Sequence, residues 1–178
     1  MNHPLRRTTT IMSHVMLPED ANPSGNIHGG VVMKHIDNAA GVTAMRHSRS
    51  NVVTASIERL DFHYPMYIGD LIVLKASLNA VSRTSMEVGV RVEAEDLMTG
   101  EIRHTASAYL TFVSLDETGR PRLLPPYEPE TEEECRRHRA ALKRMRIHKK
   151  KRLRRANSSG APSSDTSGLI SGDHEKSG

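Results

Sequence analysis

The residues of this chain best suited to chemistry lie between Gly29 and Asp37, at the start of an apolar segment. Asp37 stands in a run that is otherwise almost wholly apolar, about two helical turns after the pair Gly29-Gly30. The free N–H groups at a helix start, here those of Gly29, Gly30 and Val31, can hold a developing oxyanion with the help of the helix dipole. A carboxylate that activates water or attacks directly, beside such donors, is the minimum equipment for hydrolysing an acyl group.

The same pattern has a purely structural explanation, which stays open at this point. Aspartate in the first turns of a helix is commonly a surface residue that compensates the dipole, and two glycines before a helix are commonly a turn. His28 precedes the glycines, and a lone histidine is a weak catalytic signal, so we expect it to shape the loop. The stretch PSGNIHGG lacks the Gly-Lys-Ser/Thr ending of a P-loop, which excludes a nucleotide hydrolase of that class.

A helix must carry this group, and the sequence predicts one over about residues 30–47. A loop rich in Pro, Gly and Asn precedes it. The segment is apolar over most of its circumference, which predicts burial on all sides, whereas its polar residues gather near its start. Gly41 costs the helix roughly 1 kcal/mol relative to alanine. We therefore expect a sheet wrapped tightly around the helix to require a glycine there.

Five segments have the alternation of β-strands, one before the helix at residues 8–16 and four after it, at 52–62, 70–82, 85–96 and 101–115. In the strand from Ser85, three valines and Ala94 point one way and charged residues the other, so one face is covered and one is wetter. The connectors SRTS and LMTG are short enough for antiparallel hairpins and too short for helical crossovers. The predicted fold class is α+β, with one long helix against a curved antiparallel sheet of about five strands.

Composition divides the chain into three regions. Residues 1–127 form the predicted domain and hold 12 Lys and Arg against 13 Asp and Glu. Residues 128–155 predict a helix with acids first and bases last, and 12 of the 25 basic residues lie in 136–155. Its apolar stripe is thin, so we expect a surface helix. Residues 156–178 are rich in Ser and Gly, and we expect them to be disordered.

The composition also narrows the environment and the chemistry. No apolar run approaches the ~18 residues of a membrane helix, and the N-terminal residues lack the apolar core of a secretory signal. Cys135 is the only cysteine, so an internal disulfide and a cysteine-based metal site are excluded. The histidines have no ligand spacing, so we expect no metal. These features suit the cytoplasm.

Four blocks of sequence, in the same order, carry a resemblance to a known family. They are PEDANPSGNIHGGVVMKHIDNAAG, FHYPMYIGD, VSRTSMEVGV and FVSLDETGRPRLLP. Through them residues 8–124 resemble the hotdog-fold acyl-CoA thioesterases, in particular the type of the cytosolic brain acyl-CoA hydrolase and its single-domain bacterial relatives. The resemblance implies the hotdog fold, in which an antiparallel sheet wraps a long helix.

The resemblance also implies roles for individual residues. Asp37 matches the catalytic carboxylate of the family, either a general base for water or a nucleophile on the thioester carbonyl. Asn22 matches a catalytic asparagine that helps to place water or substrate and comes from the opposite subunit of a dimer. Gly29 and Gly30 match the oxyanion donors. The implied reaction converts acyl-CoA and water to a fatty acid and free coenzyme A, with no metal or redox cofactor.

Further expectations concern substrate contacts and assembly. The hairpin of Arg83, Thr84 and Ser85 matches one that touches coenzyme A, and the charge and fork geometry of arginine suit phosphate. The helix would form one wall of an acyl tunnel, with candidate linings Met33, Ile36 and Ala40. The implied active unit is a homodimer with two complete sites, and the resemblance leans towards a hexamer built as a trimer of dimers.

Two alternatives come from other functional classes. One is a non-catalytic acyl-CoA sensor whose basic segment binds nucleic acid or acidic lipid, although no DNA-reading motif accompanies that segment. The other is a hotdog hydratase or dehydratase. Those relatives place a catalytic histidine with the acidic residue, a pattern that this helix offers less cleanly. The pairing of Asp37 with Asn22 favours catalysis over sensing.

Overall fold

The computed structural model describes residues 8–158. Most of the tail predicted to be disordered lies outside this range, but residues 156–158 belong to the last helix. In chain order the elements are β1 (Thr9–Val15), the short 3-10 helix η1 (Pro18–Asp20), α1 (Gly29–Ser48), β2 (Asn51–Phe62), β3 (Leu71–Val81), β4 (Ser85–Glu95), β5 (Ile102–Leu115) and α2 (Glu132–Ser158).

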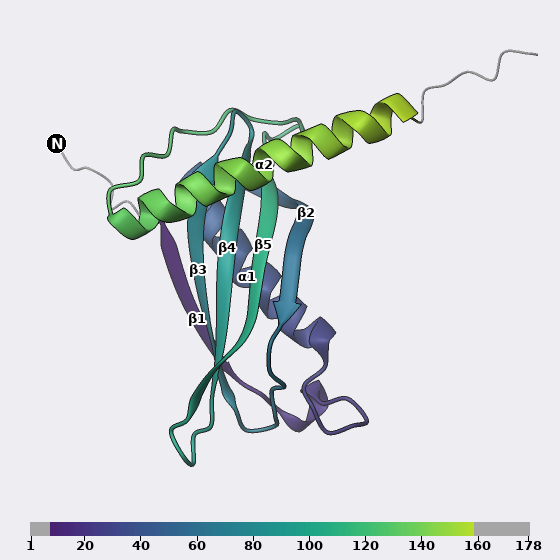
Figure 1. Ribbon diagram of the computed structural model, residues 1–178, viewed down its shortest axis with the longest axis vertical. Helices are drawn as coiled ribbons and strands as arrows, with labels where there is room; N and C mark the ends of the chain where they lie inside the picture. Colours follow the sequence, from purple (N-terminus) through teal and green to yellow (C-terminus); the bar gives the residue numbers. More distant parts are fainter. Residues whose placement is uncertain (1–7, 159–178) are drawn as a thin grey trace, which may run out of the picture. The chain divides into compact units, whose positions relative to one another are not determined.

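The five strands form one antiparallel sheet in the order β1-β3-β4-β5-β2, with α1 against one face (Figure 1). Each strand predicted from alternation is present within one or two residues, and the predicted helix is one residue longer at each end. The expected α+β hotdog arrangement is confirmed.

The core lies between α1 and the inner face of the sheet, and it is filled by aliphatic side chains and methionine. The buried face of α1 includes Val32, Ile36, Ala39, Ala40 and Ala44. The expectation that α1 is buried on all sides is wrong for the single chain, because Met33 is 40% exposed and Met45 is 45% exposed. One side of α1 is therefore uncovered.

Gly41 is not required by close packing, contrary to the expectation from sequence. A Cβ atom added to this glycine would lie 3.8 Å from the ring of Phe112, which is ordinary van der Waals contact. The sheet leaves room for a methyl group, so Gly41 destabilises the helix without a steric reason within the chain.

The outer face of the sheet is polar, as the alternation in β4 predicts, and the first part of α2 covers some of it. Glu87 points outward and is nevertheless 0% exposed, because Arg144 of α2 binds its carboxylate with N–O distances of 3.0 and 2.6 Å. Ala141 of α2 is fully buried. Residues 132–144 of the predicted surface helix are thus packed on the sheet.

Helix α2 begins four residues later than predicted, because a capping box sets its start. The hydroxyl of Thr131 accepts the N–H of Glu134, and the carboxylate of Glu134 accepts the N–H of Thr131. The chain forms two compact units, of which the first ends at Arg144 and the second begins at Met145. The first part of α2 therefore belongs to the same unit as the sheet.

Among the described residues, none of the helices combines the length and apolar character that crossing a membrane requires.

Candidate active site

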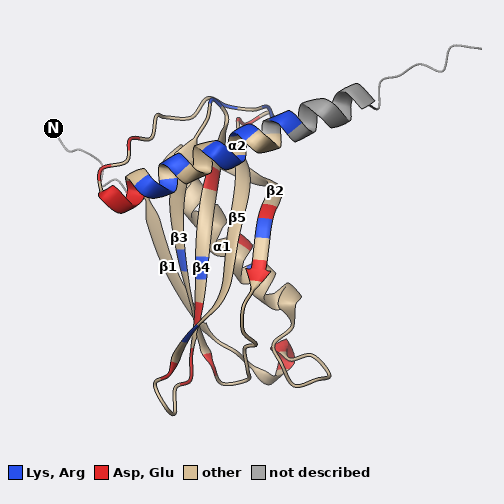
Figure 2. Cartoon of the chain, in the orientation of Figure 1, with Lys and Arg blue, Asp and Glu red and all other residues tan. Residues whose placement is uncertain are grey.

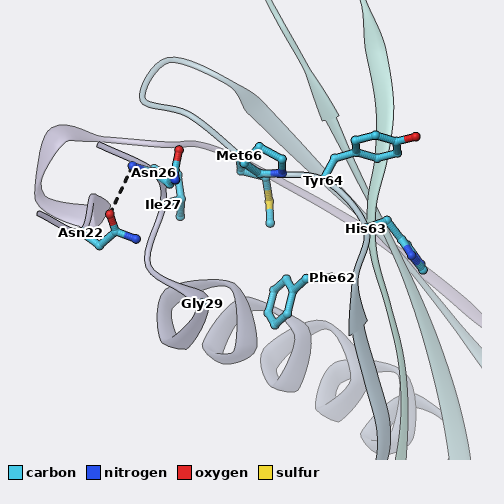
Figure 3. Close-up of a pocket in the computed structure, with 9 residues that line it drawn as sticks. Asn22, Asn26, Ile27, Gly29, Phe62, His63, Tyr64 and Met66 are labelled. Carbon is cyan, nitrogen blue, oxygen red and sulfur yellow. Dashed lines mark hydrogen bonds between the residues drawn. The ribbon is translucent and has the colours of Figure 1, made fainter. Parts of the chain in front are cut away.

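A cavity of about 370 Å³ lies where the loop before α1 meets the segment after β2 (Figure 3). Asn22 and Gly29 line it, together with Asn26, Ile27 and the run of residues 62–66. The structure thus brings together two of the predicted site residues, one from the turn-rich loop and one from the helix start.

Asn22 presents a hydrogen-bond donor to this cavity. Its side-chain oxygen accepts the backbone N–H of Ser24 at 2.9 Å and that of Asn26 at 3.3 Å, and the backbone N–H of Asn22 donates to the Asn26 carbonyl at 2.7 Å. This Asx turn occupies the oxygen of the amide. The NH₂ end is directed towards the cavity in Figure 3. Asn22 can therefore donate to a carbonyl oxygen or to water.

The first turn of α1 keeps fewer donors available than the sequence suggests. His28 is the N-cap, and its Nδ1 accepts the N–H of Gly30 at 3.2 Å, while its carbonyl accepts the N–H of Val31 at 2.9 Å. Within residues 8–158, the N–H of Gly29 has no acceptor. Of the three expected oxyanion donors, Gly29 is the one left for a ligand, and His28 shapes the loop as expected.

Hydrogen bonds between neighbouring loops fix the walls of the cavity. The N–H of Ile27 donates to the carbonyl of Met66 at 2.8 Å. Asp70, which is 5% exposed, accepts the N–H of Tyr67 at 2.9 Å and binds the guanidinium of Arg103 at 2.9 Å. A paired, largely buried carboxylate therefore holds the segment that faces Asn22 and Gly29.

Asp37 is half-buried on α1, where its Oδ1 accepts the hydroxyl of Thr54 at 2.6 Å. The register of β2 against β5 shifts between Thr54 and Ser56, and such bulges redirect side chains. Sequence reasoning missed Thr54, because a threonine in a strand resembles any other β-branched residue. Only its contact with Asp37 marks it.

In a single chain, Asp37 does not line the cavity that holds Asn22 and Gly29. It follows Gly29 by eight residues, which corresponds to about 12 Å along the helix axis. A substrate carbonyl placed on the Gly29 N–H would therefore lie far from the Asp37 carboxylate of the same chain.

The predicted coenzyme A residues lie at the other end of the sheet. Arg83, Thr84 and Ser85 are in and beside the β3–β4 turn, whereas the cavity adjoins the end of β2. Phe62 at the cavity is level with Val92 of β4, seven residues from Ser85, which corresponds to about 23 Å along the strand. The carbonyl of Thr84 accepts the N–H of Ser114 in β5 and that of Arg83 accepts the N–H of Leu124, at 3.0 Å each, which holds the turn against the end of β5 and the chain after it. One chain does not join this turn to the cavity.

An uncovered apolar surface lies on the two elements that carry Asp37 and Thr54. β2 is an edge strand of the sheet, and its Val53, Ile57 and Phe62 are 43%, 42% and 48% exposed. Met33 of α1 is exposed as well, so it lines neither the core nor the described cavity. The other two tunnel candidates, Ile36 and Ala40, are packed in the core.

In the part of the chain that the structure describes, no group of three or more His, Cys, Asp or Glu side chains could hold a metal ion.

Comparison with known proteins gives consistent matches. A model of the Thioesterase superfamily matches residues 24–101. The chain is 42% identical over 141 residues to Protein VdlD of Helicobacter pylori, covering 79% of this chain and 80% of that protein. It is 37% identical over 147 residues to the uncharacterized acyl-CoA thioester hydrolase YkhA of Bacillus subtilis, covering 83% and 86%. It is 38% identical to the cytosolic acyl coenzyme A thioester hydrolase of Mus musculus, of which it spans only 33%.

Solved structures agree with these matches. The crystal structure of an apo-hexameric acyl-CoA thioesterase has a TM-score of 0.79 at 44% identity, covering 84% of this chain and 96% of that one. The acyl-CoA hydrolase of Staphylococcus aureus, in complex with butyryl coenzyme A, coenzyme A and coenzyme A disulfide, has a TM-score of 0.78 at 32% identity, covering 85% and 92%. Variants of that hydrolase replace an asparagine, an aspartate 15 positions later and a threonine 17 positions after the aspartate, each by alanine.

Proposed function

The chain belongs to the thioesterase superfamily, and from this premise we propose that it hydrolyses acyl-CoA thioesters to free fatty acid and coenzyme A. It is a hydrolase of the acyl-CoA thioesterase type. The observation that carries the finer proposal is the bond between the Asp37 carboxylate and the Thr54 hydroxyl, on a surface beside an uncovered sheet edge.

Asp37 is the proposed reactive carboxylate, and Thr54 orients it. Asn22, Asp37 and Thr54 have the spacing of the asparagine, aspartate and threonine replaced in the Staphylococcus aureus hydrolase: Asn22 precedes Asp37 by 15 positions, and Thr54 follows it by 17. This agreement supports the choice of the three residues, including Thr54, which no sequence motif indicates.

The proposed oxyanion donors are the side-chain NH₂ of Asn22 and the N–H of Gly29, because both line the same cavity. Gly30 would join them only if its N–H left the ring of His28. In the water route, Asp37 takes a proton from water as the oxygen attacks the thioester carbon. The carbonyl oxygen becomes negative between the donors, the C–S bond then breaks, and the thiolate of coenzyme A takes up the proton.

Direct attack by Asp37 is the other route, and it forms a mixed anhydride that water then opens. A single turnover in ¹⁸O-labelled water tests the direct route when water opens the anhydride at the aspartyl carbonyl, because label then enters the carboxyl group of Asp37. Opening at the acyl carbonyl puts the label in the fatty acid, as activated water does, so trapping of an acylated Asp37 with hydroxylamine separates these two cases.

A homodimer is the proposed active unit. The Asp37 carboxylate lies too far along α1 from the N–H of Gly29, and so from the cavity that Asn22 also lines, for all three groups to act on one carbonyl within a chain. The exposed edge of β2 and its apolar side chains suit pairing with a second copy, which would bring Asp37 of one subunit to the cavity of the other. A hexamer built from three such dimers is supported by the hexameric thioesterase among the similar structures.

Other subunits of this assembly would supply Arg83, Thr84 and Ser85 to coenzyme A, because in one chain they lie at the far end of the sheet. No metal or redox cofactor enters the proposed reaction. We also propose a cytoplasmic location. The support for it is that the mouse relative is named a cytosolic hydrolase, and this chain matches one third of that protein's length.

Free-thiol release from a series of saturated acyl-CoA substrates tests the proposal. We expect turnover by the purified protein and a fall in kcat of roughly 100-fold or more for Asp37→Asn, as is usual when a general base is removed. Glu101→Gln removes an exposed carboxylate at the β4–β5 turn and serves as the matched control. Equal thiol release by the wild type and Asp37→Asn would show that Asp37 is not the reactive carboxylate.

The same measurements separate the alternatives. Acyl-CoA binding without thiol release by the wild type would favour a sensor, in which the basic α2 segment could hold nucleic acid or acidic lipid. Turnover of an enoyl-CoA but of no saturated acyl-CoA would favour a hydratase or dehydratase.

A further inference from the structure

Two histidine rings are stacked between β1 and α1. The ring centroids of His14 and His35 lie 4.2 Å apart, and the ring planes are inclined by 35°. Both side chains are half-buried. Because β1 and β2 are the two edge strands of the sheet, this pair lies away from the edge proposed for pairing with a second copy. Neither histidine has a role in the proposed hydrolysis.

Each ring has one nitrogen that is buried without a hydrogen bond. Among the described residues, Nε2 of His14 and Nδ1 of His35 have no hydrogen-bond partner. A neutral imidazole carries its proton on one nitrogen only, so each buried nitrogen can remain unprotonated. A charged imidazolium carries a proton on both nitrogens. Protonation would therefore bury an N–H donor with no acceptor, which is unfavourable.

The charges around the pair also favour neutral rings. Burial lowers the pKa of His35 most, and His14 lowers it further. Lys34 of the same helix acts in the same direction, whereas the negative charge of Asp20 in η1 opposes them. In the neighbouring strand β3, the residue opposite His14 is the uncharged Ile72. Two charged rings at this separation would repel each other, so the stack is stable when both rings are neutral.

Asp20 connects the pair to the loop that carries Asn22. Figure 2 shows the acidic residues of η1 in red, near the start of α1. The carboxylate of Asp20 accepts the N–H of Leu17 at 2.9 Å, and its carbonyl accepts the N–H of His28, the N-cap of α1, at 2.8 Å. A positive charge on His35 attracts this carboxylate and competes with the N–H of Leu17. The bonds that hold η1 and the loop after it therefore depend on the charge of the histidine pair.

We propose that His14 and His35 form a pH-sensitive clasp between β1 and α1. The clasp is closed while both rings are neutral. Protonation of either ring opens the stack, draws Asp20 away from Leu17 and loosens the loop that carries Asn22. The effect on catalysis rests on the proposed function, because Asn22 is a donor of that site, whereas the clasp itself does not.

Thermal stability tests the clasp without any assay of activity. Because folding lowers the pKa of His35, the unfolded chain binds more protons between that lowered pKa and the ordinary value of about 6.5. The contribution of the clasp to stability is therefore complete above about pH 6.5 and declines as the pH falls through this window. His35→Phe keeps an aromatic ring in the stack and cannot be protonated. From about pH 7.5 to about pH 5.5, we expect the Tm of the wild type to fall about 2–4 °C more than that of His35→Phe.

A control variant and a second measurement complete this test. His148→Gln removes an imidazole from the second compact unit, and its Tm should follow the pH dependence of the wild type within about 1 °C. An equal fall of Tm in the wild type and His35→Phe would refute the clasp. A titration of ¹³C-labelled histidines by NMR needs the wild type alone for its readout, and a pKa of His35 at or above about 6.5 would also refute the proposal.

Hydrogen exchange tests the connection to the loop. At the same pH, about 5.5, the intrinsic exchange rates are equal in the two proteins, so any difference reports local opening. We expect the backbone amides of residues 17–28 to exchange faster in the wild type than in His35→Phe. Equal exchange of these amides would overturn the connection between the clasp and the loop.

Thiol release connects the clasp to the proposed function. From about pH 7.5 to about pH 5.5, the kcat of the wild type should fall about 2-fold more than that of His35→Phe, because half of the molecules are open at the lowered pKa. Matching pH profiles of kcat would overturn the effect on catalysis. If no acyl-CoA is hydrolysed at any pH, the proposed function fails, while the comparisons of Tm and hydrogen exchange still decide on the clasp.

Discussion

Replacing Thr54 by valine tests the assigned site most directly, because the change removes one hydroxyl and keeps the shape of the side chain. In the structure that hydroxyl donates to Oδ1 of Asp37 at 2.6 Å. Valine suits a β-strand, so the fold of β2 should tolerate it. The expected effect is therefore on the orientation of the carboxylate and on turnover.

The size of the effect follows from the bond. A hydrogen bond to a charged group contributes about 1.5–3 kcal/mol. Thr54 is exposed and Asp37 only half-buried, so water can partly replace the hydroxyl and the lower end applies. About 1.5 kcal/mol corresponds to roughly a 10-fold fall in kcat, with KM changed little because the hydroxyl binds the carboxylate and not the substrate.

The assay is thiol release under saturating acyl-CoA, with thermal unfolding measured alongside. Thr54→Ser keeps the hydroxyl and should recover most of the rate. Thr111→Val is the matched control, since Thr111 makes a similar bond to Glu58, at 3.0 Å, on the outer face of the sheet. If Thr54→Val keeps kcat within about 2-fold of the wild type, or if Thr111→Val loses as much, the orienting role is wrong.

Three further predictions concern stability. His28→Ala removes the N-cap acceptor of the Gly30 N–H and should cost about 1 kcal/mol, seen as a Tm lower by a few degrees, whereas His28→Asn should restore most of it. Gly41→Ala should stabilise by about 0.5–1 kcal/mol, because the new methyl group meets Phe112 at an ordinary distance; a lower Tm would contradict this. The pKa of Glu93 is lowered, mainly by hydrogen bonds from Arg91 and Lys75, so the stabilisation by its carboxylate is present at neutral pH and is lost as the pH falls through the lowered pKa. The Tm difference between wild type and Glu93→Gln should therefore shrink below about pH 4, and a difference independent of pH would refute the assignment.

The elements of the fold could be predicted from the sequence because each has its own periodic signal. Alternation marks the strands, and the short connectors between the last three leave antiparallel pairing as the arrangement that fits. The capping of α2 was not foreseen, since Thr131 and Glu134 stand among other acids. Burial of Glu87 was not foreseen either, because its cause is Arg144, 57 positions away.

For the site, the sequence indicated candidate residues but not their spatial relations. Asn22, Gly29 and Asp37 lie within 16 positions of one another, yet a single chain joins only the first two at a cavity. Thr54 could not be found from local pattern, because what distinguishes it is a contact with α1 created by the register shift in β2. The hydrogen bond from the Gly30 N–H to the ring of His28 could not be predicted from local pattern either.

The sequence by itself determined the order of helix and strands, the inner and outer faces of the sheet and the placement of a carboxylate shortly after two glycines, because these depend on local periodicity and neighbouring residues. Only the tertiary structure decided which donors remain available, which hydroxyl holds Asp37 and which outward-facing residues α2 buries. These depend on which side chains meet across elements, and such contacts arise from packing between segments that are distant in the chain.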